Sequence, residues 1–130
     1  MRYYITPRNF GGLIIPIPIQ NAYLRNFSKI KEIEFSLPVS EVCFPKKYPT
    51  LIGLLKTASL SNSPIVFVSI LQLPFDIAEE FEVVLDKFPE FKKIIVIAAL
   101  ENTQGDLFKL WKKYKSTNYV LKNATSKLSW

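Results

Sequence analysis

The chain has 130 residues, a formal net charge of +6 and a hydrophobic content of 48%, with one cysteine and no histidine. This length fits one domain with a buried core. The composition excludes an internal disulfide, a Ser-His-Asp triad, a Cys-His pair and the usual zinc sites. No apolar run is long enough for a membrane span, and no signal-peptide pattern opens the sequence, so we expect a cytoplasmic protein.

Strand and helix patterns alternate along the chain. A capping box of Asp76 and Glu79 predicts one helix start, and Asn102 is expected to cap the last helix. The runs before these two helices are almost wholly apolar and predict central strands. The expected elements are a strand at Arg2–Ile5, a helix at Gln20–Ile30, a strand at Glu32–Leu37, a helix at Thr50–Ser59, a strand at Pro64–Ile70, a helix from Asp76 to about Phe88, a strand at Ile94–Ala99 and a helix at Thr103–Tyr114.

This order predicts the α/β class, as a three-layer α/β/α domain with a four-stranded parallel sheet, flavodoxin-like or resolvase-like. The domain is expected over residues 1–114, and residues 115–130 form a basic C-terminal tail. Ligands bind outside the carboxyl ends of strands in such sheets. The sequence therefore directs attention to four segments, namely Thr6–Gly12, Ser36–Glu41, Ser69–Asp76 and Glu101–Asn102.

Arg8 follows the first strand and lies close to Gly11 and Gly12. An arginine fork suits phosphate or carboxylate, and glycines let backbone amides approach an anion. The run matches neither a P-loop nor G-x-G-x-x-G, and a surface or ion-pair role for Arg8 remains the alternative.

Other polar side chains near the same edge are candidates for substrate binding. Their alternatives are helix capping and plain solvent exposure. The full set of predicted substrate-binding residues is Arg8, Asn9, Gly11, Gly12, Gln20, Asn21, Arg25, Ser36, Gln72 and Asp76.

Glu41 and Glu101 each follow a strand and are the acids best placed for catalytic proton transfer. An apolar rim can raise the pKa of a carboxyl group towards neutrality. Tyr4 and Tyr48 are expected to serve packing. No motif calls for a cofactor, and no metal site is expected. Residues 107–130 carry six lysines and no acid, a charge that attracts nucleic acid, anionic lipid or an acidic partner, or simply forms a solvated face.

These motifs, in this order, resemble the sporadic carbohydrate cluster proteins, a family from bacterial gene clusters for lipopolysaccharide and capsule sugars. The resemblance covers Tyr4 to about Asn102. The matching pieces are Tyr4-Ile5, Arg8, Phe10-Gly11-Gly12, Ile15-Pro16, Gln20-Asn21, Arg25, Phe35-Ser36, Glu41, Ile65–Ser69, Gln72-Leu73-Pro74, Asp76 and Glu101. A more distant resemblance, to serine recombinase catalytic domains, extends to the fold alone, because Thr6-Pro7-Arg8 offers no serine after the first strand.

The resemblance implies a role in making a surface polysaccharide. The expected ligand is a sugar, sugar phosphate or nucleotide sugar, and the expected reaction is that of a cofactor-independent isomerase, epimerase or lyase. The alternative is a non-catalytic accessory subunit of a larger carbohydrate enzyme or glycosyltransferase. A homodimer or a partner enzyme of the pathway fits either function, whereas nucleic-acid binding would rest on charge alone.

Overall fold

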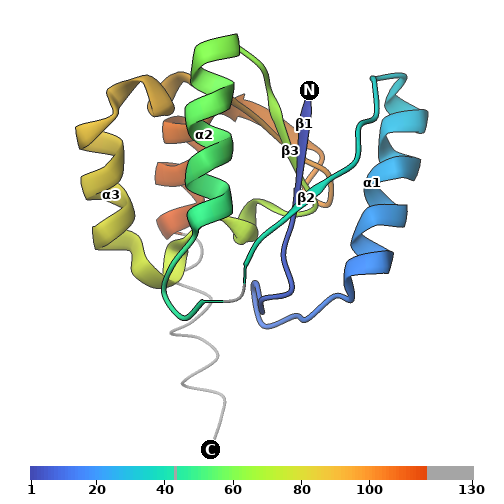
Figure 1. Cartoon of the computed structure of the whole chain (residues 1–130), viewed down its shortest axis with the longest axis horizontal. Coiled ribbons are helices and arrows are strands. Elements are labelled where there is room, and N and C mark those ends of the chain that lie inside the picture. The colour runs from blue at the N-terminus through green and yellow to red at the C-terminus, as the bar shows by residue number, and fades with distance from the viewer. Residues whose placement is uncertain (43, 117–130) are drawn as a thin grey trace, which may run out of the picture.

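The computed structural model describes residues 1–42 and 44–116, which form one mixed sheet flanked by helices (Figure 1). A final helix occupies residues 107–116. The other elements are β1 (Arg2–Ile5), α1 (Ile17–Lys31), β2 (Val39–Ser40), α2 (Pro49–Ser61), β3 (Ile65–Phe67), α3 (Ala78–Lys87), β4 (Ile95–Ala98) and β5 (Thr103–Asp106), with short 3₁₀ helices η1 (Ile70–Gln72), η2 (Phe75–Ile77) and η3 (Pro89–Lys93).

The sheet has five strands in the order β2-β1-β3-β4-β5. β1 pairs in parallel with β2 and β3, and β3 pairs in parallel with β4. β5 runs antiparallel to β4, with Thr103 opposite Ala98. The α/β class is thereby confirmed, but the expected four-stranded, wholly parallel sheet is replaced by a five-stranded mixed one.

The expected helix at Thr103–Tyr114 was wrong in its first turn, because this turn forms β5. Asn102 has a positive φ of 48° and donates its backbone N–H to Ala99, so it reverses the chain instead of capping a helix. Thr103 and Gly105 are poor helix formers, and their backbones pair with β4. The helix then begins at residue 107 and continues through residue 116; residues 117–130, most of the expected tail, lie outside the described residues, as does Cys43.

The second strand was also misplaced. The alternating residues Ile33 and Phe35 are half-buried, and the Phe35 ring packs 5.1 Å from that of Tyr3, but the segment pairs with no strand of the described sheet. Pairing with β1 begins only at Val39, after Pro38. Alternating burial here reflects side-chain packing without a backbone ladder.

Two helix starts differ from the predictions. α1 begins at Ile17 instead of Gln20, because Pro18 falls in its first turn, where a proline costs no hydrogen bond. α3 begins at Ala78 with no side-chain cap, so the capping box of Asp76 and Glu79 does not form. Asp76 lies in η2 and accepts a hydrogen bond from Tyr48 instead.

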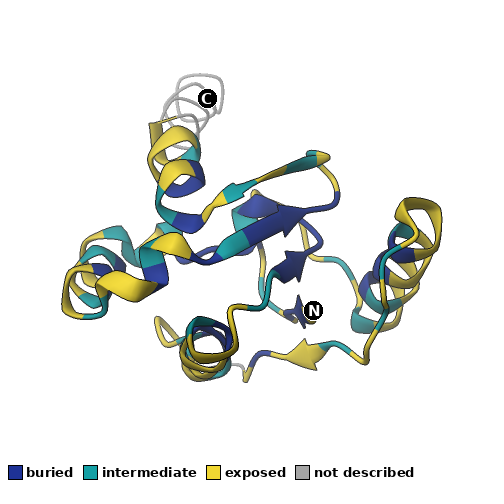
Figure 2. Ribbon diagram, turned by 90° about the horizontal axis from the view of Figure 1, so that it is seen from above, coloured by how far each residue is buried: buried dark blue, intermediate teal, exposed yellow. Residues whose placement is uncertain are grey.

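Helices lie on both sides of the sheet (Figure 2), and the core consists of two unequal clusters of buried side chains. On one face of the sheet, α2, α3 and the helix at 107–116 contribute Leu55, Phe81 and Trp111 to a large cluster with Tyr4 and Phe67. The other face carries a smaller cluster in which α1 contributes Leu24. No helix among the described residues is long and apolar enough to cross a bilayer.

The helix at 107–116 is tied to α3 through Glu82. The Glu82 carboxylate accepts hydrogen bonds from Lys115 and from the Trp111 indole N–H. These two donors, that of Lys115 first, lower the pKa of Glu82. The contact fixes the last described turn of the chain against the domain.

Candidate functional site

The segments that follow β1 to β4 meet at the carboxyl edge of the sheet, as expected for parallel strands. Side-chain hydrogen bonds join them across the edge. Gln72 Nε2 donates to Gln20 Oε1 at 3.0 Å, and Ser69 Oγ donates to Glu101 Oε2 at 2.7 Å. The edge is therefore a set of loops held together in advance of any ligand.

Gln20 and Gln72 form the buried centre of this edge. Gln20 Oε1 also accepts from the Thr6 N–H at 3.1 Å, and its Nε2 donates to the carbonyls of Thr6 and Ile15. Gln72 Oε1 accepts from the Val68 N–H at 3.0 Å. Both side chains are at most 3% exposed, so their amides bind the protein's own backbone and do not point to a ligand.

Glu41 is equally enclosed, at 3% exposure. Its Oε1 accepts from the Tyr4 hydroxyl at 2.9 Å and from the Leu51 N–H at 3.0 Å. Its Oε2 accepts from the N–H groups of Val42 and Thr50, at 3.0 and 2.9 Å. The Glu41 carboxylate thus caps the first turn of α2, although it is not adjacent to the helix in sequence. Negative charge is favoured at the amino end of a helix.

Tyr4 completes the Glu41 cluster. Burial, followed by the Glu41 charge, raises the pKa of the Tyr4 phenol well above its usual value. Tyr4 is therefore a permanent hydrogen-bond donor to Glu41. With its accepting positions taken and no opening to solvent, Glu41 is badly placed to exchange a proton with a substrate.

Glu101 is the more accessible of the two acids. It is half-buried, and its oxygens accept from the Ser69 hydroxyl and, at 2.8 Å, from the Ile70 N–H. Ser69 Oγ in turn accepts from the Leu71 N–H at 3.1 Å, which caps η1. The pair orders the loop after β3 and leaves part of the Glu101 side chain open to solvent.

Arg8 links the β1 loop to the segment before α2. One guanidinium nitrogen donates to the carbonyls of Phe44 and Lys47, and the guanidinium lies 4.1 Å from the centre of the Tyr48 ring. No carboxylate of the described residues forms an ion pair with it. The Arg8 charge is therefore fixed in position without being neutralised.

Tyr48 and Asp76 extend this cluster to η2. The Tyr48 hydroxyl donates to Asp76 Oδ1. Burial and this hydrogen bond raise the pKa of Tyr48 above its usual value, so the phenol keeps its proton. Asp76 was predicted as a ligand-binding residue. In the structure its carboxylate accepts the Tyr48 hydrogen bond and so joins η2 to the segment before α2.

Asn9, Gly11 and Gly12 form a tight turn beside Arg8. Phe10 and Leu13 exchange two backbone hydrogen bonds, and the two glycines between them have φ values of +58° and +81°. Asn9 Oδ1 accepts from the Gly12 N–H at 3.0 Å. Positive φ at both central residues explains the Gly-Gly pair, as in a type I′ turn.

Replacing Gly11 with alanine should destabilise the fold more than replacing Gly12. Both changes strain a left-handed backbone, at about 1 kcal/mol. A Cβ at Gly11 would also overlap the Leu71 Cδ1 methyl, whereas one at Gly12 meets no atom within 4 Å. We expect losses of about 2 and about 1 kcal/mol in urea unfolding. Equal losses would show that Leu71 moves aside freely.

Two predicted site residues, Ser36 and Arg25, lie apart from the residues joined at this edge. Ser36 donates to the Met1 carbonyl at 3.0 Å, which places it at the amino edge, because the strand expected to end there does not form. Arg25 is exposed midway along α1, with its guanidinium 4.9 Å from the centre of the Phe35 ring. A third predicted site residue, Asn21, has a buried Oδ1 with no hydrogen-bond partner among the described residues.

Sequence reasoning placed Thr6 in an edge segment without giving it a role, and it missed Tyr4 and Tyr48 as hydrogen-bonding members of the edge. Tyr4 and Tyr48 were assigned to packing alone. The available signal was the position of Tyr4 just before the end of the first strand and of Tyr48 directly before a helix that begins with Pro49. No family model, curated protein or solved structure matches the chain significantly.

Proposed function

We propose that this protein binds a sugar phosphate or nucleotide sugar at the carboxyl edge of its sheet, in the cytoplasmic synthesis of a bacterial surface polysaccharide. The observation that carries the proposal is the state of Arg8. Its guanidinium is held by two carbonyls and a tyrosine ring and has no carboxylate partner in the described chain. A phosphate is a suitable counterion for an arginine that is held in position but has no carboxylate partner.

The rest of the edge supports a sugar next to that phosphate. Glu101 supplies a half-buried carboxylate that suits sugar hydroxyl groups, and the buried Ser69 hydroxyl holds this carboxylate in position. If the protein is an isomerase, epimerase or lyase, Glu101 is the proton-transfer residue, because Glu41 is enclosed. Gln20 and Gln72 position the loops and make no contact with the ligand.

The fold and family assignments belong to the same proposal. The order β2-β1-β3-β4-β5 is that of flavodoxin-type sheets, but the antiparallel β5 departs from their parallel pairing, so the proposal keeps both the flavodoxin-like and the resolvase-like alternatives. Membership of the sporadic carbohydrate cluster family rests on the ordered sequence motifs. The setting in polysaccharide synthesis rests on the same motifs.

Thermal unfolding in the presence of sugar phosphates and of CMP-, GDP-, UDP- and dTDP-sugars tests the proposal. A ligand at 100 times its dissociation constant adds about 2.7 kcal/mol of stability. We expect one class of phosphorylated sugar to raise the melting temperature, and the Arg8→Ala variant to lose this response. The unphosphorylated sugar should give a much smaller shift.

Arg8 also holds the loop before α2, so its loss needs a control. Tyr48→Phe removes the hydrogen bond to Asp76 in the same cluster but leaves the guanidinium in place. This variant should lose some stability and keep the ligand response. A wild-type response that survives Arg8→Ala would contradict the proposed phosphate site.

A non-catalytic accessory subunit is the second candidate, favoured by apolar side chains on the same loops. Leu13, Ile14 and Phe44 are 56%, 71% and 55% exposed. Exposed apolar groups of this size indicate a protein interface when they lie together. If the protein is an accessory subunit, none of the sugar phosphates or nucleotide sugars should raise its melting temperature. The double variant Ile14→Asp, Phe44→Asp should then no longer associate with a purified glycosyltransferase or other enzyme of the pathway.

A further inference from the structure

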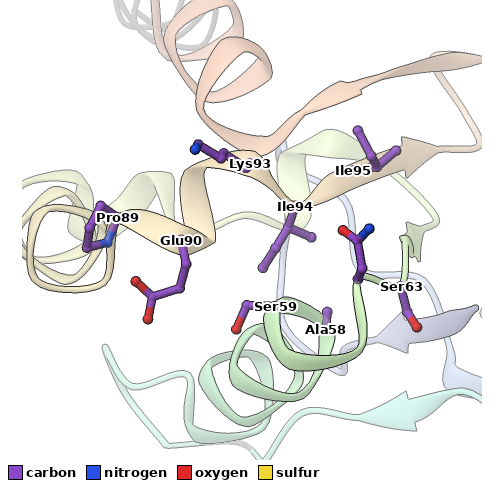
Figure 3. A pocket seen from close by; sticks show the side chains of 9 residues that line it. Ala58, Ser59, Ser63, Pro89, Glu90, Lys93, Ile94 and Ile95 are labelled. Atoms are coloured by element: carbon purple, nitrogen blue, oxygen red, sulfur yellow. The ribbon is translucent and has the colours of Figure 1, made fainter.

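A pocket of about 410 Å³ opens at the opposite, amino edge of the sheet (Figure 3). One wall is the end of α2 and the turn after it, with Ser59, Asn62 and Ser63. The other wall is η3, with Glu90, and the start of β4. The size lies within the usual range of small-molecule sites, about 300–1,000 Å³.

The walls of this pocket favour a positive charge. The C-terminal end of a helix carries a partial negative charge, and the last turn of α2 has no basic residue to offset it. Glu90 forms no ion pair with any other described residue. Figure 3 shows Glu90 extending from η3 towards the α2 side, while Lys93, the single cation among the described residues that line the pocket, extends away from Glu90.

The remaining lining groups suit hydroxyls and a carbon framework. Ser59 Oγ donates to the Lys56 carbonyl, so its lone pairs are free to accept. Ser61 Oγ donates its single proton to the Thr57 carbonyl, so Ser63 Oγ, 3.0 Å from Ser61 Oγ, donates to Ser61 and keeps lone pairs that can accept from a ligand hydroxyl. Beneath these groups, Ala58 and Ile94 are 1% and 5% exposed and form an apolar floor.

We propose that the amino-edge pocket binds an amino sugar through its protonated amine. The amine lies between the Glu90 carboxylate and the last carbonyls of α2, and the sugar hydroxyls contact Ser59, Asn62 and Ser63. The choice of a sugar over another small amine rests on the carbohydrate function proposed above. The site is separate from the carboxyl edge and from Arg8.

Titration of the ¹⁵N-labelled full chain with D-glucosamine, followed by NMR, tests the pocket residue by residue. We expect saturable amide shifts at Ser59, Asn62 and Glu90. Glucose and N-acetylglucosamine, which lack the charged amine, should bind about tenfold more weakly. Glu90→Gln should weaken glucosamine binding by a similar factor, while Glu79→Gln, an exposed acid on α3 outside the pocket, should leave it unchanged.

Three results would overturn the assignment. These are the absence of saturable shifts in the pocket, equal binding of glucose and glucosamine, and an unchanged affinity in Glu90→Gln. Equal binding of cyclohexylamine would overturn the sugar part of the proposal. Shifts caused by a sugar phosphate at Arg8 and Gly11 report on the carboxyl edge alone, so failure of one site is distinguishable from failure of the other.

Discussion

Replacing Glu41 with alanine is expected to lower the free energy of unfolding by about 3–5 kcal/mol. The change leaves four donors without their acceptor: the Tyr4 hydroxyl and the N–H groups of Val42, Thr50 and Leu51. It also removes the negative charge at the start of α2. Urea unfolding monitored by circular dichroism measures the loss.

Two comparison variants separate the causes. Tyr4→Phe removes one hydrogen bond and keeps the carboxylate on three backbone donors, so we expect a loss of about 1 kcal/mol. Glu79→Ala removes an exposed acid from the first turn of α3 and should cost less than about 1 kcal/mol. A Glu41→Ala protein of nearly normal stability would contradict the structural role and return Glu41 to the list of catalytic candidates.

The Gln20→Leu variant is expected to lose about 2–4 kcal/mol of unfolding free energy. Leucine has a similar size but leaves the Thr6 N–H and carbonyl, the Ile15 carbonyl and Gln72 Nε2 without partners. Chemical unfolding of Gln20→Leu, Gln72→Leu and the double variant measures the coupling between the two amides. The double variant should lose less than the sum of the single ones, because each single change already breaks the bond that joins them.

The same series decides between two roles for these glutamines. If the two glutamines have a structural role, the variants should lose stability, while their affinity for the ligand, measured below the melting temperature, should change little. Normal stability together with lost binding of the sugar phosphate would show that the amides contact ligand, as first predicted from their position in the sequence.

The strands that the sequence predicted well are those with an unambiguous apolar signal. β3 and β4 lie within the apolar runs Pro64–Ile70 and Ile94–Ala99. β5 has no such signal, because Thr103-Gln104-Gly105-Asp106 contains no large apolar side chain. Its conformation depends on β4, to which a turn at Asn102 returns it.

The sequence predicted the location of the candidate site better than the roles of its individual residues. The carboxyl-edge loops converge as the alternation of strands and helices implied. The hydrogen-bond partners of individual side chains could not be predicted, because Gln20 and Gln72 are 52 positions apart in the sequence and Ser69 and Glu101 are 32 positions apart. A polar residue at a strand end looks the same in sequence whether it binds a ligand or another loop.

The antiparallel course of β5 also affects how stability is distributed between the two faces of the sheet. It places the helix at 107–116 on the face already covered by α2 and α3, and α1 covers the other face alone among the described helices. The buried residues of α1 are Gln20, Leu24 and Ser28, of which one is apolar. Partial opening, in which α1 detaches while the larger cluster stays intact, therefore requires less free energy than global unfolding. Because Gln20 is bonded to Gln72, each such opening would also release the loop after β3, which couples the motion of a peripheral helix to the shape of the carboxyl edge.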